Sequence, residues 1–357
     1  MIHILLIGIF SLTTASLVHP NVALQSLEPA SGWYDYSRTP ILTRKDWTDS
    51  FIKDCRKQSG QNDLIPLHVM NKDTVRIASY NIHFWCKPHL SPFNYTTGQS
   101  RHGAQDIEEN FENIISAIKS INADILCLQE VLLFDQSRIK DTLTELGYQY
   151  LYFFDEADWA GSLLCVAIAS KYPFVEEPRG KTFAVDTTPR AHPFEKHCFL
   201  TATISLPNNK KITAYTSHFD CFDDSESIRH DELKEIIEEN ACVVMDNCFI
   251  CGDFNAVRSR DLQYRVGDHT AWDLLNQDNI RRTKKPTQTK ALNLLEENGF
   301  NDCFSSAKIS MPKFSVWNGT VVDFIFLNKY WNLSISGCYF YYTSASDHLP
   351  VILDVKV

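Results

Sequence analysis

Apolar runs that suit buried strands alternate along this chain with segments that suit amphipathic helices, and this alternation restricts the fold more than any other feature. The run 123–131 is apolar at most positions, as is the run 248–254. Such runs are typical of strands that are covered on both faces. Between the runs, segment 107–118 repeats apolar residues at the spacing of one helix face. The alternation therefore predicts sheets with helices on their outer faces.

Further strands and helices extend the same pattern toward the C-terminus. Strands are expected at 75–82, 148–154, 163–169, 199–206, 212–217, 321–328, 338–342 and 351–355, and helices at 138–146, 228–240 and 289–298. Two of these helices end at Gly147 and near Gly299, which suits the glycine preference of helix C-termini. A chain of 357 residues with 44% hydrophobic content can bury one large α/β core.

The N-terminus has the features of an export signal. An apolar run at 4–10 is followed by small residues up to Ser16. We therefore predict a signal peptide over 1–16, an N-terminal extension over 17–71 and the main domain over 72–357, with secretion or residence in the secretory lumen. The run lacks a preceding Lys or Arg, so an uncleaved anchor is the alternative. It is too short for a stable membrane span, and no later stretch is long enough.

The 11 cysteines show no zinc-site spacing. Cys127 and Cys165 lie within apolar strand patterns, so we expect buried thiols there. Two others, Cys248 and Cys251, form a CxxC sequence, but side chains three apart on a strand point to opposite faces. Export would permit one or two disulfides, with Cys55 and Cys86 among the candidates.

The charge balance argues against a generally basic surface. The chain has 34 Lys and Arg against 44 Asp and Glu, a net charge of −10. A broad basic patch, the usual footprint of nucleic-acid binding, is therefore not expected, although a local basic rim remains compatible with this total. An acidic balance also fits a site that gathers carboxylates around a hard cation.

Polar and ionisable residues follow or interrupt the apolar strands at six places. They are Asn81 in SYNIH, Glu130 in LQEV, His218 and Asp220 in TSHFD, Asp253 and Asn255 in GDFN, Asp323 in VVDFIF, and Asp347 and His348 in SASDH. Strand ends converge at one edge of a sandwich, so these residues can share a pocket. Oxygen ligands suit Mg²⁺, and imidazoles suit proton transfer.

Each of these residues also has an ordinary structural explanation. Asn81 alone suits a turn, and Asp253 with Asn255 suits a β-turn after a glycine. His218 and His348, taken singly, are more often structural than catalytic. Glu130 is harder to explain this way, because buried carboxylates are rarely left unpaired. The joint occurrence favours a catalytic site.

Six segments between about Thr74 and the C-terminus resemble the successive motifs of the endonuclease/exonuclease/phosphatase (DNase I-like) superfamily. In chain order they are SYNIH, ADILCLQEV, TSHFD, GDFNA, VVDFIF and SDHLPV. The resemblance implies a four-layered α/β/β/α sandwich. It also implies a phosphodiesterase that uses Mg²⁺, or alternatively Mn²⁺, and directs water in line onto phosphorus. Separately, we expect the protein to be a monomer. The substrate would be nucleic acid or a phospholipid headgroup.

The resemblance also implies a role for each motif residue. Glu130 would be the principal metal ligand, supported by Asn81 and Asp347, while Asp253 would orient or activate water. Asn255 and His218 would contact the phosphate, and His348, paired with Asp323, would be the base or would stabilise the phosphate. Arg229 would contact the substrate, or else be an exposed helix charge paired with Asp231 or Glu232.

The subfamily stays open at this stage. The chain lacks the PxWCDR-like motif of inositol polyphosphate 5-phosphatases, and Arg258 to Asp261 replaces the Ser-Tyr pair of DNase I-like endonucleases. A phosphomonoesterase of the inositol-phosphatase kind and a catalytically lapsed binding protein remain the alternatives. Asn94, Asn318 and Asn332 begin glycosylation sequons, although Asn318-Gly319 also suits a hairpin turn, which we favour.

Overall fold

The computed structural model describes residues 44–64, 73–88, 104–159, 162–185, 197–221, 225–239, 245–258, 260–261, 265–266, 269–270, 276 and 288–357. The predicted signal peptide and most of the predicted extension lie outside these ranges and stay predictions. Residues from Leu42 to the C-terminus form one compact unit. Within the described residues, no helix combines the length and apolar character needed to cross a membrane.

Two six-stranded sheets form the centre of this unit. The first has the order β13 (Ser334–Phe340), β14 (Val351–Lys356), β1 (Thr74–Asn81), β2 (Ile125–Leu132), β4 (Ser162–Ser170) and β3 (Tyr150–Trp159). The second has the order β11 (Asn301–Asp302), β12 (Asp323–Leu327), β8 (Cys248–Asp253), β7 (Lys211–His218), β6 (Cys198–Ser205) and β5 (Arg179–Thr182). A separate pair joins β9 (Arg265–Val266) to β10 (His269–Thr270).

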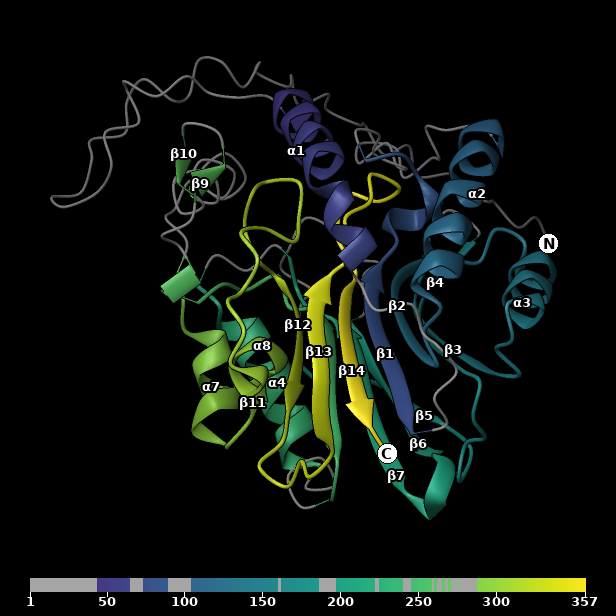
Figure 1. The fold of residues 1–357 in the computed structure, drawn as a ribbon, viewed down its shortest axis with the longest axis vertical. Helices are drawn as coiled ribbons and strands as arrows, with labels where there is room; N and C mark the ends of the chain where they lie inside the picture. Colours follow the sequence, from purple (N-terminus) through teal and green to yellow (C-terminus); the bar gives the residue numbers. More distant parts are fainter. Residues whose placement is uncertain are drawn as a thin grey trace, which may run out of the picture. The chain divides into compact units, whose positions relative to one another are not determined.

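Helices cover the outer face of each sheet (Figure 1). The helices are α1 (Arg44–Gln58), α2 (Ala104–Ile121), α3 (Gln136–Glu145), α4 (Ser227–Glu238), α7 (Ala291–Glu297) and α8 (Cys303–Ala307), with 3-10 helices η3 (Ser59–Leu64), η4 (His83–Trp85) and η5 (Pro207–Asn209). α2 and α3 lie beside the first sheet, and α4, α7 and α8 lie beside the second. The predicted α/β/β/α sandwich is therefore confirmed.

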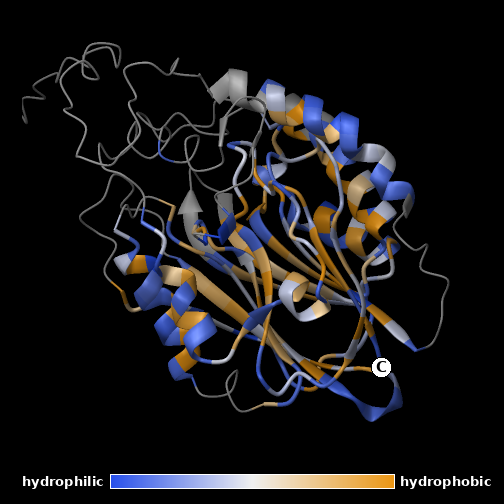
Figure 2. Ribbon diagram, turned by 60° about the vertical axis from the view of Figure 1, so that its left-hand side comes forward, coloured by the Kyte–Doolittle hydropathy of each residue, from blue (hydrophilic) through white to orange (hydrophobic). Residues whose placement is uncertain are grey.

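The two-residue period of each strand explains the layers. In the first sheet, Ile77 and Ile125 belong to the core between the sheets, whereas their neighbours Ala78 and Leu126 belong to the core under α2 and α3. Strands that are buried on both faces must be apolar throughout, which is the pattern in the sequence. Figure 2 shows the result as largely hydrophobic strands beneath helices with one hydrophilic face.

A parallel pair of strands lies inside each sheet, and each pair is joined through a helix. β1 pairs with β2 and encloses α2 in sequence, while β7 pairs with β8 and encloses α4. The carboxyl ends of these four strands therefore point to one edge of the sandwich, the position where ligands bind in open α/β sheets. We call this the catalytic edge.

Gly252 is required by the close approach of β7 and β8. Its φ is +143°, and a Cβ placed there would lie 1.9 Å from the Ser217 carbonyl oxygen. A larger residue would push the strands apart directly before Asp253. The glycine of GDFN thus sets the position of the carboxylate that follows it.

Segment 44–64, within the predicted extension, packs against the main domain. The rings of Phe51 and Phe314 lie 5.6 Å apart in an edge-to-face arrangement. The Asn62 side chain donates to the Tyr342 carbonyl and accepts from the Tyr342 amide, each at 2.8 Å. Neither helix α1 nor strand β5 was expected from the sequence, because both lie where the apolar period is weak.

The cysteines agree in part with expectation. Cys127 and Cys165 are buried, as predicted. Cys55 and Cys86, the two disulfide candidates, are also buried and form no disulfide within the described residues, so the expectation that they take part in disulfides is wrong. They belong to two separate apolar cores, one on each side of the first sheet. Instead, Cys303 and Cys338 lie in contact, with their sulfur atoms 2.6 Å apart.

Candidate active site

The catalytic edge collects the residues singled out in the sequence. Asn81 and His218 end β1 and β7, and Asp253 ends β8. Asp323 begins β12, which runs antiparallel to β8 and places Asp323 directly opposite Asp253. Glu130, Asp347 and His348 complete the set, and the side chains of all seven residues are at most about one-tenth exposed. The sequence predicted this convergence, and the roles of the individual residues stay predictions.

Glu130 reaches the site through an irregularity in β2. The register with β4 shifts between Leu128 and Val131, and Glu130 has a φ of 53°. β-bulges of this kind redirect side chains beside active sites. Burial alone would raise the pKa of Glu130, but the neighbouring His83, His218 and His348 outweigh it and lower the pKa to about 2. Glu130 is therefore ionised at neutral pH.

Asn81 joins the carboxylates of Glu130, within β2, and Asp253, at the end of β8. Its Nδ2 atom donates to Glu130 Oε1 at 2.9 Å and to Asp253 Oδ2 at 3.0 Å. Two carboxylates this close repel each other unless a donor or a cation lies between them. The amide of Asn81 supplies that donor, so Asn81 positions both carboxylates.

Asp253 lies between two imidazoles. Its Oδ2 atom is 3.6 Å from His348 Nε2 and 3.8 Å from His218 Nε2. The other oxygen, Oδ1, accepts from the Asn255 amide at 2.9 Å. The turn after β8 thus holds Asp253 Oδ1, while Oδ2 faces the space that His218 and His348 share.

His348 is held by a buried carboxylate and a serine. Its Nδ1 atom lies 2.9 Å from Asp323 Oδ2, which leaves Nε2 facing the site. The Ser315 hydroxyl donates to the same Asp323 oxygen at 2.6 Å. Burial would lower the pKa of His348, but Asp323, Asp253 and Asp347 raise it to about 10. The pair fixes the ring orientation, as histidine–carboxylate pairs commonly do.

Two residues of the site were missed from the sequence. Ser315 belongs to none of the six motifs, although the hairpin turn expected at Asn318-Gly319 folds its segment back beside Asp323. His83 lies within SYNIH, but no role was assigned to it. Its Nδ1 atom is 3.3 Å from Asp347 Oδ1 and 3.7 Å from Glu130 Oε2. The signal was the position of His83, two residues after Asn81 at the end of an apolar strand.

The remaining predicted residues support loops beside the site. Asn255 Nδ2 donates to the Phe219 carbonyl at 2.9 Å, which ties together the turns after β7 and β8. Arg229 is only 4% exposed, so the alternative of an exposed helix charge is wrong. Its Nη1 atom donates to the Asp220 carbonyl at 2.8 Å, on the loop that follows His218. Contact of Arg229 with substrate stays a prediction.

The donor set fits a divalent cation. Glu130 Oε2 is buried and has no hydrogen-bond partner within the described part of the chain. A buried carboxylate oxygen without a partner is costly unless a cation binds it. Glu130, His218 and Asp253 each place a ligand atom within 4.8 Å of the others. The residues that could hold a metal ion are Glu130, Asp253 and Asp347, with imidazole nitrogens beside them.

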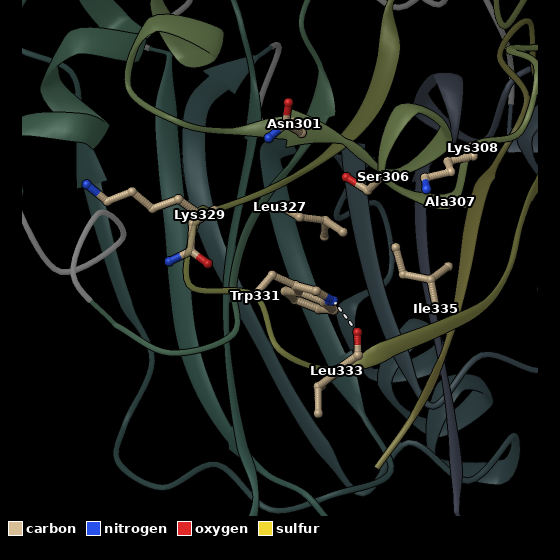
Figure 3. Close-up of a pocket in the computed structure, with 10 residues that line it drawn as sticks. Asn301, Ser306, Ala307, Lys308, Leu327, Lys329, Trp331, Leu333 and Ile335 are labelled. Atoms are coloured by element: carbon tan, nitrogen blue, oxygen red, sulfur yellow. Dashed lines mark hydrogen bonds between the residues drawn. The ribbon is translucent and has the colours of Figure 1, made fainter.

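A separate cavity lies away from this site (Figure 3). It is lined by Asn301, Ser306, Ala307, Lys308, Leu327, Asn328, Lys329, Trp331, Leu333 and Ile335. Leu327 ends β12, whereas Asp323 begins it, so the cavity lies at the edge opposite the catalytic edge. None of its lining residues belongs to the site described above.

Fold and site together define the class of phosphoester hydrolases with a DNase I-like sandwich. A model of the Endonuclease/Exonuclease/phosphatase family matches residues 97–348, and the chain belongs to this family. Members of the family are generally hydrolases that act on phosphoesters and depend on a divalent metal. No curated protein sequence matches this chain.

Solved structures share the fold at low sequence identity. An endonuclease/exonuclease/phosphatase from Beutenbergia cavernae is 17% identical with a TM-score of 0.57, over 80% of this chain and 72% of that chain. The human Nocturnin catalytic domain is 17% identical with a TM-score of 0.53, over 80% and 94%. ANGEL2, a 2′,3′-cyclic phosphatase, in complex with adenosine-2′,3′-vanadate, is 16% identical with a TM-score of 0.54, over 80% and 96%.

Proposed function

We propose that this protein is an exported, Mg²⁺-dependent phosphodiesterase, with Mn²⁺ as the alternative ion. One observation carries the proposal. Asp253 Oδ2 lies between the Nε2 atoms of two histidines, while the neighbouring Glu130 has a buried oxygen without a partner among the described residues. A water-activating carboxylate, imidazoles for phosphate and a cation-binding carboxylate therefore share one space.

The side chains support in-line attack of water on phosphorus. Asp253 Oδ2 and His348 Nε2 face the same space. With a pKa of about 10, His348 is charged at neutral pH and can stabilise the phosphate, so Asp253 is the group that can take the proton of the attacking water. Asp323 keeps the His348 ring in place and stabilises its positive charge. His218 faces the same carboxylates and can donate to the phosphate or to the leaving oxygen.

The cation would be held by Glu130 and Asp347, with Asn81 setting the position of the first carboxylate. When bound, it would neutralise phosphate charge and stabilise the charge that develops during attack. Asn81 already holds Glu130 Oε1 through its amide, so the second oxygen, Oε2, is the one available to the ion.

Nucleotide phosphodiesters are the first substrate class to test. The adenosine-2′,3′-vanadate bound to ANGEL2, a 2′,3′-cyclic phosphatase of the same fold, supports this order. The net charge of −10 gives no general support for long nucleic acids, so short oligonucleotides and cyclic nucleotides should come first. Phospholipid headgroups form the second group to test.

The decisive experiment measures hydrolysis with Mg²⁺ and with EDTA. The comparison covers oligonucleotides, a 2′,3′-cyclic nucleotide, sphingomyelin vesicles and inositol phosphates. The variants are His348→Ala and the control His230→Ala, whose side chain lies on α4 and is 40% exposed. We expect metal-dependent diester cleavage that His348→Ala removes and His230→Ala retains. Cleavage of monoesters alone would make the protein a phosphomonoesterase. A folded chain that binds no Mg²⁺ and cleaves none of these substrates would be a binding protein of the same fold.

Export can be tested through two glycosylation sequons whose asparagines differ in exposure. Asn332 is exposed, whereas Asn318 is 8% exposed and its Oδ1 atom accepts from the Thr320 hydroxyl at 2.6 Å. In a eukaryotic secretory host, glycopeptide mass spectrometry should find a glycan on Asn332 and none on Asn318. Asn332→Gln should lose it, and Asn318→Gln is the matched control. A chain retained in the cytosol without glycans would contradict export.

A further inference from the structure

Three consecutive residues beside the active site adopt a left-handed backbone although none is glycine. His83, Phe84 and Trp85 have φ values of 48°, 55° and 64°. Each such residue costs on the order of 1 kcal/mol or more relative to a right-handed conformation. Strain of this kind persists only where the surroundings fix it, and it concentrates at functional sites.

Buried contacts hold this turn in place. Trp85 is fully buried, and its indole nitrogen donates to the Leu132 carbonyl at 2.9 Å. From α2, Asn110 donates to the carbonyls of Trp85 and Cys86 at 3.2 and 2.8 Å. The Cys86 amide closes the turn onto the His83 carbonyl at 2.7 Å. These contacts offset the strain, and the turn presents the His83 side chain to the site.

His83 faces the two carboxylates that are expected to hold the cation. Its Nδ1 atom lies 3.3 Å from Asp347 Oδ1 and 3.7 Å from Glu130 Oε2. Glu130 Oε2 is the buried oxygen that has no hydrogen-bond partner within the described residues. On the other side of the carboxylate, Oε1 is contacted by Asn81 and His218. The two oxygens of Glu130 therefore face different groups.

The distances suit three ligand atoms around one ion. Ligands at about 2.1 Å from a common cation are separated by about 3.0 Å in octahedral geometry and about 3.4 Å in tetrahedral geometry. The distances from His83 Nδ1 to Asp347 Oδ1 and to Glu130 Oε2, 3.3 and 3.7 Å, lie close to these values. A charge-assisted hydrogen bond is shorter, at about 2.7–2.9 Å.

We propose that His83 Nδ1 is a nitrogen ligand of the cation that Glu130 and Asp347 hold, and that it shifts the preference of the site from Mg²⁺ toward Mn²⁺. Imidazole suits transition metals, whereas Mg²⁺ prefers oxygen ligands. His83 is thereby a specificity-determining residue for the metal. The inference rests on the proposed metal-dependent function and deepens it.

The test measures metal binding directly. Titration calorimetry gives the Mn²⁺ and Mg²⁺ affinities of the full chain, and pulsed electron paramagnetic resonance of bound Mn²⁺ detects directly coordinated nitrogen. The variant is His83→Asn, because asparagine tolerates a left-handed backbone. We expect the variant to bind Mn²⁺ about tenfold more weakly, to bind Mg²⁺ within threefold of the parent, and to lose a nitrogen coupling.

Two controls locate the effect. His230, on α4, has a side chain that is 40% exposed, and His230→Asn should leave both affinities and the nitrogen coupling unchanged. If His83→Asn fails to fold, parent chain labelled with ¹⁵N-histidine reports the ligand without substitution, because a histidine ligand changes the coupling pattern. Absence of any histidine coupling in the parent chain would overturn the proposal.

The outcomes separate this inference from the proposed function. Metal-dependent hydrolysis with an unchanged nitrogen coupling in His83→Asn, or with equal losses of Mn²⁺ and Mg²⁺ affinity, would overturn the role of His83 alone. A parent chain that binds neither ion would overturn both. Loss of the coupling together with a selective loss of Mn²⁺ affinity would support the nitrogen ligand.

Discussion

The two edges of the sandwich use left-handed backbone in different ways. At the edge opposite the site, asparagine and glycine fill the left-handed positions that precede strands, and the exposed Lys308 adopts the same backbone after α8. The asparagine and glycine positions are Asn122, Asn208, Asn209, Asn247, Gly147 and Gly299. Asparagine and glycine accept this conformation at little cost. At the catalytic edge, His83 and Glu130 adopt it. The comparison teaches that backbone strain is tolerated where a particular side chain must reach the site.

The two edges also differ in whether their charged side chains are buried or exposed. The catalytic edge has four buried carboxylates, and each lies near an imidazole. They are Glu130, Asp253, Asp323 and Asp347. At the opposite edge, Lys308 and Lys329 line the cavity of Figure 3 and are exposed. Buried charges need partners, whereas exposed charges are solvated. Substitutions should therefore have large effects at the first edge and small effects at the second.

The largest effect is expected from Glu130→Gln. The change keeps the shape but removes the charge that would bind the cation, so kcat should fall about 10³-fold, or about 4 kcal/mol of transition-state stabilisation. Initial rates on the preferred diester with saturating Mg²⁺ measure it, with the exposed Glu297→Gln as control. A loss below tenfold would mean that Glu130 is not the principal ligand.

Arg258→Leu should cause the largest loss of stability. Arg258 is 5% exposed and contacts Asp261 at 2.6 Å and Asp302 at 2.5 Å. Removing it takes the buried guanidinium from both carboxylates and leaves Asp302, among the described residues, with only the cation of Arg260, at 3.3 Å, which should lower the free energy of unfolding by about 3–5 kcal/mol. Urea unfolding followed by circular dichroism measures the change. Asp302→Asn in the same chain should recover part of it, and an unchanged midpoint would contradict this account.

Ser315→Ala should have a moderate effect on catalysis. The hydroxyl donates to Asp323 and accepts from the Val322 amide at 2.9 Å, so it fixes the carboxylate that orients His348. Loss of such a supporting contact should lower kcat about tenfold and leave KM nearly unchanged. The exposed Ser305→Ala is the control. An equal rise in KM would indicate a contact with substrate instead.

The smallest effect is expected at the opposite edge, from Lys329→Ala. Its side chain is solvated, so the free energy of unfolding should change by less than about 0.5 kcal/mol and the turnover should not change. Thermal unfolding and initial rates measure both quantities. A large loss of activity would show that the two edges are coupled, and the contrast between them would no longer hold.

The sequence by itself determined the layers and most of the site. Continuous apolar runs such as 248–254 require cover on both faces, which only a sheet between layers provides. The ends of those runs carried Asn81, Glu130 and Asp253, and strand ends converge by geometry. These features depend on local periodicity, which can be read along the chain.

Tertiary structure alone decided the remaining contacts. The turn at Asn318-Gly319 was expected, but no motif marks Ser315 as the partner of Asp323 across it. The sequence left open whether Arg229 contacts substrate or is an exposed helix charge, and only the loop that carries Asp220 shows that it is buried. His83 lay in a recognised motif, but only the left-handed turn held by Asn110 presents it to Glu130 and Asp347. Contacts between distant segments depend on packing in three dimensions, and periodicity along the chain does not encode that packing.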